Sequence, residues 1–177
     1  HLKLTGHAAT RRAIELLADD YVYSLKRVLD PKLRASQLAE LEPHIVGAEA
    51  AVARARRTGG FDYDAPLEGI KTLDRYTFQV KIREPLYIFI YNFADCRIAC
   101  AVAREVVERY GEDVGSHPVG TGPFRLTFWR RSSKMVFEAN PDFREDYFDG
   151  EPAADDVKGQ AILKRQKGKR LPMVGRI

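Results

Sequence analysis

Strict alternation between apolar and polar residues runs through the middle of this chain of 177 residues. From Tyr76 to Arg83, every apolar side chain is followed by a polar one. This period of two is typical of a β-strand with one buried face and one face in water. Asp74-Arg75 just before it marks a turn from a shorter strand. We therefore expect an antiparallel hairpin within the segment from Ile70 to Pro85.

A second alternating pair follows further along the chain. Residues 124–129 (FRLTFW) alternate, a polar turn occupies 130–133, and residues 134–139 (KMVFEA) return as the partner strand. Asn140-Pro141 then ends the pairing, because this dipeptide favours a turn. The sequence thus predicts two separate β-hairpins.

Helical spacing of apolar residues recurs between and around the hairpins. The first such segment, from Ala18, has acidic residues in its first turn and is stopped by Pro31. The predicted helices are 18–31, about 44–57, 99–110 and about 157–165. Residues 86–93 are apolar throughout, and periodicity does not distinguish strand from helix there. Helices together with antiparallel hairpins indicate an α+β fold.

The basic excess lies at one end of the chain. The net charge is +4, and seven Lys or Arg occur from Lys158 to Arg176 without any Asp or Glu. The simplest interpretation is a solvated, mobile or partner-covered tail. The alternative is a nucleic-acid-binding module using residues 158–176, although no aromatic side chain is interleaved there for base stacking. No apolar run approaches the roughly 18–20 residues that a membrane-spanning helix needs.

Two cysteines, Cys96 and Cys100, lie four residues apart. On a helix they would share a face, but an α-helix would be strained by a disulfide between them. We therefore expect two free thiols. This pair lacks the further ligands of a metal site, and the four histidines show no ligand spacing, so no metal or other cofactor is expected.

The segment HPVGTGPF, residues 117–124, suggests three kinds of loop. A phosphate-binding loop needs Lys and Ser/Thr after its last glycine, but here Pro123 and Phe124 follow. A nucleophile elbow needs a serine between the glycines, and none is present. We expect a structural turn at Gly120, Thr121, Gly122 and Pro123, in which the glycines permit positive φ and the flanking prolines restrict it.

A small hydrolase is the other alternative considered. Its candidates are Ser116, His117 and an acid such as Asp113. These side chains would have to converge within hydrogen-bonding reach, with the imidazole activating the hydroxyl. Neighbouring solvated side chains are the simpler interpretation, so we expect no enzyme and no catalytic residues.

Four segments in series carry a resemblance to a known family. They are ADDYVYSLKRVLDP, LDRYTFQVKIREP, AVAREVVERYGEDVGSHPVGTGPFRLTFW and SKMVFEANPDFRE. Together they resemble the extracellular solute-binding proteins of family 5, the dipeptide- and oligopeptide-binding components of ABC importers. The resemblance extends from about residue 14 to the end of the sequence.

The resemblance implies an α+β fragment of a periplasmic binding protein of type II-like fold. Family members are about three times longer and close two lobes around a ligand, so residues 1–112 would be a subdomain of the first lobe. Residues 113–177 would belong to the core of the ligand-binding lobe. The implied location is the periplasm or cell exterior, with a signal peptide or lipid anchor upstream. The implied partners are a peptide or similar small solute and a membrane permease. Neither nucleic acid binding nor membrane insertion is implied. The fragment could also self-associate through exposed apolar surface.

The resemblance also suggests where a ligand would lie. Two segments would approach the cleft: the loop around Arg34 to Gln37, and the turn containing Asp95, Cys96 and Arg97. Asp95 could meet a ligand amine and Arg97 a ligand carboxylate. The alternative for the last two is an ion pair within their own loop.

Overall fold

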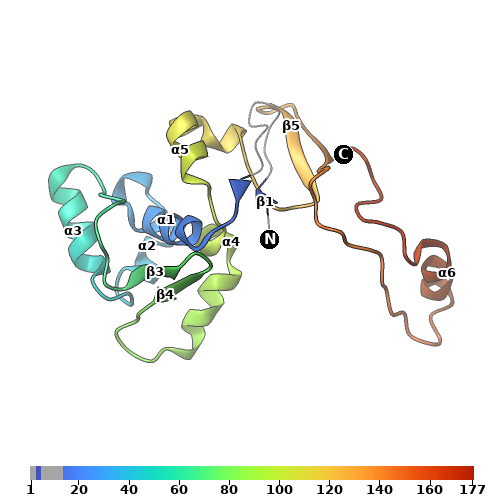
Figure 1. Cartoon of the computed structure of the whole chain (residues 1–177), viewed down its shortest axis with the longest axis horizontal. Helices are drawn as coiled ribbons and strands as arrows, with labels where there is room; N and C mark the ends of the chain where they lie inside the picture. Colours follow the sequence, from blue (N-terminus) through green and yellow to red (C-terminus); the bar gives the residue numbers. More distant parts are fainter. Residues whose placement is uncertain (1–2, 5–13) are drawn as a thin grey trace. The chain divides into compact units, whose positions relative to one another are not determined.

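The computed structural model describes residues 3–4 and 14–177, and the chain forms two compact units (Figure 1). One unit consists of residues 16–109, and the other joins residues 1–15 to residues 110–177. Each unit is described here by itself. Whether residues 1–112 and 113–177 correspond to parts of two lobe regions stays a prediction.

The unit of residues 16–109 contains helices packed on one hairpin. Its elements are α1 (Ala18–Leu29), η1 (Pro31–Leu33), α2 (Leu38–Leu41), α3 (Ala48–Thr58), β3 (Ile70–Asp74), β4 (Thr77–Val80), η2 (Tyr87–Ala94), α4 (Cys96–Ala99) and most of α5 (Arg104–Tyr110). Here η denotes a 3₁₀-helix. The hairpin β3–β4 is antiparallel and pairs Ile70 with Val80, which confirms the expected strands.

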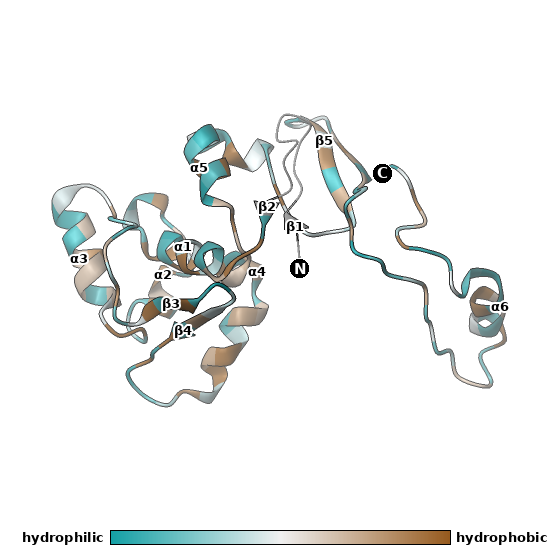
Figure 2. Ribbon diagram, in the orientation of Figure 1, coloured by the Kyte–Doolittle hydropathy of each residue, from teal (hydrophilic) through white to brown (hydrophobic). Residues whose placement is uncertain are grey.

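Helix α1 forms where the sequence predicted it and supplies the centre of the core. Asp20 accepts a hydrogen bond from the backbone N–H of Leu17 at 2.7 Å, which satisfies one of the donors at the helix start. Leu25 and Leu29 are buried and pack in one cluster with residues from the other helices and β3. That cluster comprises Leu25, Val28, Leu29, Leu41, Ile45, Ala48, Val52, Leu67, Ile70, Phe89 and Ile98. In Figure 2, β3 carries the brown colour of hydrophobic residues.

The second helix begins later than expected. Residues 44–47 do not form its first turn, because Ile45 makes an antiparallel bridge with Ile82 and Val46 N–H donates to the carbonyl of Lys81. Gly47 then adopts φ 79°, a left-handed conformation that glycine tolerates, and α3 starts at Ala48. The expected start near His44 is therefore wrong, since strand pairing takes the backbone groups that a helix would need.

The region between residues 86 and 110 also differs from the helix predicted over 99–110. The apolar run becomes the 3₁₀-helix η2, which resolves the ambiguity there. Only residues from Arg104 onward form α5. Residues 100–103 are not helical, because Cys100 is extended and the Val102 N–H donates to the Ser24 hydroxyl rather than to a carbonyl one turn earlier.

The other unit is built around a longer hairpin. Its elements are β1 (Lys3–Leu4), β2 (Ile14–Glu15), η3 (Gly111–Ser116), β5 (Phe124–Arg130), β6 (Lys134–Ala139) and α6 (Val157–Gln166). Strands β5 and β6 are antiparallel, with Phe124 opposite Ala139 and Arg130 opposite Lys134. This confirms the second predicted hairpin, the turn at 130–133 and the end of pairing at Asn140.

The basic C-terminal segment is exposed over most of its length, as a solvated segment would be, but its backbone pairs with the rest of this unit. Phe137 and Ile177 exchange two backbone hydrogen bonds of 2.9 Å, and Arg176 forms an antiparallel bridge with Glu138. Phe148 N–H donates to the carbonyl of Lys169 at 2.9 Å. Helix α6, predicted at about 157–165, lies between Phe148 and Lys169 along the chain.

Within the part of the chain that the structure describes, no helix is both long enough and apolar enough to span a bilayer.

Candidate functional site

The first candidate segment follows α1 through a sharp turn. Asp30 is buried, and its side chain accepts a hydrogen bond from Lys32 N–H at 2.9 Å, which starts η1. Arg34 ends η1 with φ 54°, a left-handed conformation uncommon for a residue with a side chain. Its side chain is exposed, whereas Gln37 is only 6% exposed. Of these two candidates, only Arg34 lies on the surface.

The second candidate segment is an exposed turn with an internal ion pair. The Arg97 guanidinium donates to both carboxylate oxygens of Asp95, with Nη2 2.6 Å from Oδ2. The Asp95 side chain also accepts from the Arg97 backbone N–H at 2.9 Å, so it caps the start of α4. These hydrogen bonds lower the pKa of Asp95 and raise that of Arg97. The alternative of an ion pair within the loop is therefore what the structure contains.

Electrostatics relate the two segments to each other. After the Asp95 contacts, the carboxylate of Glu40 is a further influence that raises the pKa of Arg97. Glu40 belongs to α2, which begins directly after Gln37. Helix α2, which follows the loop of residues 34–37, and the start of α4 thus lie within electrostatic range of each other.

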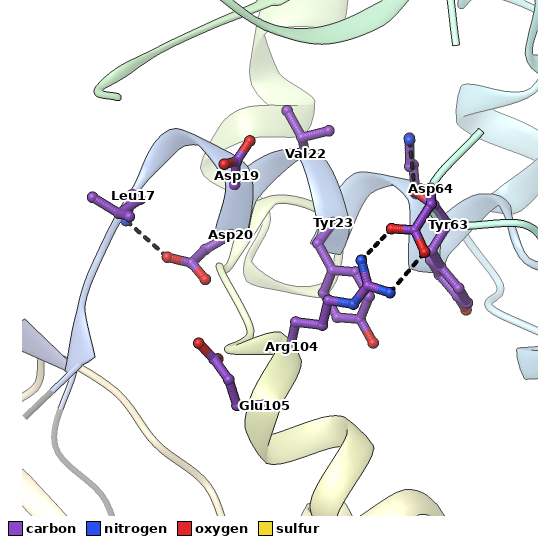
Figure 3. Close-up of a pocket in the computed structure, with 10 residues that line it drawn as sticks. Leu17, Asp19, Asp20, Val22, Tyr23, Tyr63, Asp64, Arg104 and Glu105 are labelled. Carbon is purple, nitrogen blue, oxygen red and sulfur yellow. Dashed lines mark hydrogen bonds and ion pairs between the residues drawn. The ribbon is translucent and has the colours of Figure 1, made fainter. Parts of the chain in front are cut away.

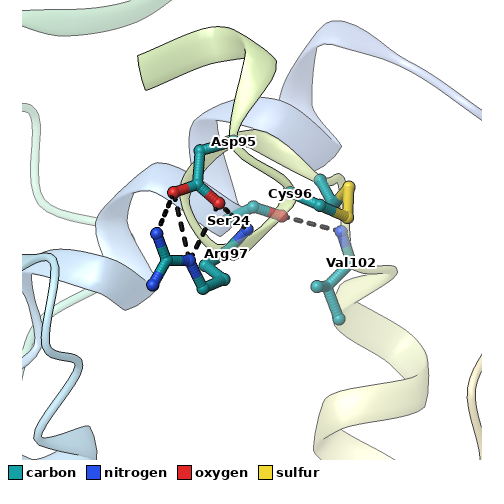
Figure 4. Close-up of a disulfide and its surroundings, with 6 residues drawn as sticks. Ser24, Asp95, Cys96, Arg97 and Val102 are labelled. Carbon is teal, nitrogen blue, oxygen red and sulfur yellow. Dashed lines mark hydrogen bonds and ion pairs between the residues drawn. A yellow bond between two sulfur atoms is a disulfide. The ribbon is translucent and has the colours of Figure 1, made fainter. Parts of the chain in front are cut away.

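Cys96 and Cys100 form a disulfide, and the expectation of two free thiols is wrong (Figure 4). Their Cα atoms are 4.6 Å apart, within the usual range for a bridge. Strain was expected for a continuous helix that contains both cysteines. In the structure, α4 ends at Ala99 and Cys100 has an extended backbone. Because the helix stops between the cysteines, they can approach each other.

The turn at residues 120–123 launches β5 and is held by one side chain. Asn140 is buried; its Nδ2 donates to the carbonyl of Gly122 at 2.9 Å, and its backbone N–H donates to the carbonyl of Pro123 at 2.8 Å. Neither Gly120 nor Gly122 has positive φ, contrary to the expected use of these glycines. The bend therefore depends on Asn140 rather than on left-handed glycines.

The three hydrolase candidates lie close together. Ser116 and His117 both contact the carboxylate of Asp113. Ser116 Oγ lies 2.9 Å from Asp113 Oδ1, and His117 Nε2 lies 3.2 Å from Asp113 Oδ2. His117 also stacks on Tyr110, with ring centroids 3.7 Å apart. A nucleophilic serine needs a hydrogen bond to its base, whereas here the hydroxyl donates to the acid. This arrangement is a capped turn, and it lacks the order of groups in a hydrolase.

A cavity of about 480 Å³ lies on the unit of residues 16–109, beside α1 (Figure 3). Arg104 pairs with Asp64 on one side of it, with Nη2 3.0 Å from Oδ2, and with Glu108 at 2.7 Å. Burial raises the pKa of Asp20, and the carboxylate of Glu105 adds to this effect. The cavity is lined by Leu17, Asp19, Asp20, Val22, Tyr23, Lys26, Tyr63, Asp64, Arg104 and Glu105. None of the five ligand candidates named from the sequence is among them.

Lys26 is the main polar residue beside this cavity that the sequence analysis missed. It is only 7% exposed, and Nζ donates to the carbonyls of Tyr63 at 2.8 Å and Ala65 at 2.9 Å. Burial lowers its pKa. A signal was present: on a helix Lys26 is a neighbour of Val22 and Leu29, which places it on the apolar side.

Comparison with known proteins identifies the family of this chain. The family described as "Bacterial extracellular solute-binding proteins, family 5 Middle" matches residues 14–169. The chain belongs to this family. Members of the family are solute-binding proteins.

Individual relatives agree with the family assignment. The Di/tripeptide-binding protein 2 of Pseudomonas aeruginosa is 29% identical over 80% of this chain and 24% of that relative. The periplasmic oligopeptide-binding protein OppA of Salmonella typhimurium is 28% identical over 71% of this chain and 22% of that relative. This family 5 chain therefore spans about a quarter of the length of the relatives it matches.

Solved structures confirm the fold class. Listeria monocytogenes OppA bound to peptide matches with a TM-score of 0.59 and 27% identity, covering 74% of this chain and 25% of that one. Burkholderia pseudomallei OppA matches with a TM-score of 0.58 and 26% identity, covering 74% and 24%. The α+β fold of periplasmic binding proteins, expected from the resemblance, is confirmed.

Proposed function

We propose that this family 5 chain is part of a binding protein that captures peptides or similar small solutes without transforming them. The observation that carries this proposal is the family match over residues 14–169, together with relatives named for di-, tri- and oligopeptide binding. Ligand would be held between this portion and a second lobe that closes over it. The captured solute would then pass to an ABC permease in the membrane.

The location we propose is the periplasm or the cell exterior, in a membrane-anchored protein. One relative is named as periplasmic, and the family is described as extracellular. The disulfide between Cys96 and Cys100 supports this location, because disulfides persist in oxidising compartments.

Within this chain we propose that Arg34, Gln37, Asp95, Cys96 and Arg97 lie beside the solute. The Asp95–Arg97 ion pair is exposed and already arranged to exchange partners: a ligand carboxylate could take the guanidinium, and a ligand amine the carboxylate. The exchange costs little, because solvent screens an exposed pair and leaves it a small contribution to stability. Arg34, in its left-handed turn, would supply a second cation to the solute.

Self-association is a further part of the proposal. The 3₁₀-helix η2 exposes large apolar side chains: Tyr87 at 93%, Ile88 and Ile90 at 66% each, and Tyr91 at 72%. An exposed apolar patch of this kind favours contact with another protein surface. Sedimentation of the 177-residue chain at rising concentration would show dimers, and replacing Ile88 and Tyr91 by serine would abolish them.

The site is tested in a chimera. Residues 14–169 replace the matching segment of the Pseudomonas aeruginosa Di/tripeptide-binding protein 2, and amide exchange is measured with and without a tripeptide. Peptide should slow exchange at residues 34–37 and 95–97. Arg97→Ala should weaken peptide binding about tenfold, the effect expected for one charge-assisted contact. The matched control is Arg57→Ala on the exposed side of α3, which should leave affinity unchanged; equal affinities for both variants would contradict the site.

A further inference from the structure

The disulfide occupies an exposed break between two helices. Both Cys96 and Cys100 are exposed, although the helix between them buries Ile98 to 2%. Figure 4 shows the bridge close to the Ser24–Val102 hydrogen bond, with the Asp95–Arg97 pair further away on the same side. A thiolate arriving from solvent can therefore reach this segment, and access of this kind is a main determinant of disulfide exchange.

The bridge fixes the chain in a conformation that the local sequence does not favour. Residues 96–110 contain neither glycine nor proline, and Ala99, Ala101 and Ala103 are strong helix formers. In an α-helix, residues four apart have Cα atoms about 6 Å from each other. The observed separation is 4.6 Å, shorter than in a helix, and Cys100 has an extended backbone. The break at residues 100–103 thus coincides with a covalent constraint.

Other contacts hold the flanks of the break without the disulfide. Val102 N–H donates to Ser24 Oγ at 2.7 Å, and Ser24 is only 4% exposed. On the preceding side, Ile98 belongs to the hydrophobic core. The closed loop is also very short, and a short loop constrains the unfolded chain less than a long one. The fold of residues 16–109 should therefore survive loss of the bridge.

We propose that Cys96–Cys100 is a redox-responsive link, which a dithiol reductant opens in the native protein to loosen residues 99–101. One thiolate of the reductant attacks a cysteine sulfur, breaks the S–S bond and forms a mixed disulfide. The second thiolate of the reductant then attacks that mixed disulfide and leaves as the oxidised reductant. Two electrons pass to the cysteines, and each takes a proton to become a thiol. The proposal is argued from the disulfide and its contacts, and its test requires no solute.

Two neighbouring amides report the change separately. Cys100 N–H donates to the carbonyl of Cys96 at 3.3 Å, within the ring that the disulfide closes. Val102 N–H is held by Ser24 instead. Opening the ring removes the constraint on the Cys100 amide. The Val102 amide keeps its hydrogen bond to Ser24. Reduction should therefore affect the two amides unequally.

The test treats the folded 177-residue chain with dithiothreitol, counts thiols by alkylation, and follows amide exchange by NMR. We expect two thiols per chain without denaturant. The amide of Cys100 should exchange at least about tenfold faster than in the oxidised chain, whereas the exchange rate of the Val102 amide should not change. The double variant Cys96→Ser/Cys100→Ser should reproduce the reduced pattern. The matched control, Ser24→Ala, should speed exchange at Val102 while the disulfide remains intact.

Two results would overturn the proposal. One is thiols that appear only after denaturation, which would make the bond inaccessible. The other is loss of protection across the core of residues 16–109 on reduction or in the double serine variant, which would make the bond a structural requirement.

Discussion

The ammonium nitrogen of Lys26 lies 2.8 Å from the backbone carbonyl oxygen of Tyr63. Through this contact and the one to Ala65, a lysine on α1 holds the loop between α3 and β3. The Tyr63 hydroxyl returns a bond to Asp30 Oδ2 at 2.6 Å, and Asp30 itself is buried. The loop between α3 and β3 is thus attached to α1 through Lys26, and to Asp30 directly after α1 through Tyr63.

The first prediction concerns Lys26. Lys26→Met keeps the aliphatic stem but leaves two carbonyls without their donor, so it should lower the free energy of unfolding by about 2 kcal/mol. Urea unfolding followed by circular dichroism measures this. Lys32→Met, on an exposed neighbour, is the control and should change stability by less than about 0.5 kcal/mol. Equal effects from both variants would mean that the two hydrogen bonds contribute nothing.

The second prediction concerns the hydroxyl of Tyr63. Burial, followed by the hydrogen bond to Asp30, raises the pKa of Tyr63 above its usual value. Tyr63→Phe leaves one oxygen of a buried carboxylate without that donor and should cost about 1–3 kcal/mol. Tyr91→Phe, at a ring that is 72% exposed, serves as the control. Thermal unfolding that is unchanged in Tyr63→Phe would contradict this role.

These two residues also show what sequence reasoning could reach. Alternation located both hairpins, and helical spacing located α1, because each pattern reflects a local period that burial of one face imposes. The sequence analysis did not single out Lys26, whose carbonyl partners lie 37 and 39 residues away. No local pattern carries a contact at that separation.

The misplaced helix boundaries have the same origin. Residues 44–47 pair with residues 81–83, and Val102 bonds to Ser24, 78 positions earlier. In both places a distant partner takes a backbone group that local propensity assigned to a helix. For the candidate site, the sequence pointed to Asp95 and Arg97 as opposite charges in one turn, and the structure pairs them. It gave no reason to expect the disulfide beside them.

The third prediction is a pH dependence at Asp20. Burial raises its pKa, so the folded state binds this proton at a higher pH than the unfolded state does. The contribution of Asp20 is therefore most stabilising below the unfolded value of about 3.9 and is lost as pH rises through the folded value. Asp20→Asn retains an acceptor for Leu17 but does not titrate. The stability of the natural chain minus that of the variant should increase as pH falls from 7 to 4, and a difference that decreases would contradict the assignment.

The fourth prediction concerns the turn before β5. Asn140→Ala removes the donor to the Gly122 carbonyl and the side-chain oxygen that accepts from Asp142 N–H at 3.1 Å. We expect a loss of about 1–3 kcal/mol in the unit that contains β5 and β6. Trp129 lies on β5, so its fluorescence reports unfolding of that hairpin. An unfolding transition identical to that of the natural chain would show that the turn does not depend on the Asn140 side chain.

The most direct measurement for the account as a whole is a calorimetric titration with one tripeptide. It compares the 177-residue chain with the chimera that carries residues 14–169 in the Pseudomonas aeruginosa relative. Because a solute-binding protein grips its ligand between two lobes, the chimera should bind with micromolar affinity and the chain alone should give no measurable heat. Micromolar binding by the chain alone, or a folded chimera that binds no peptide, would contradict the account.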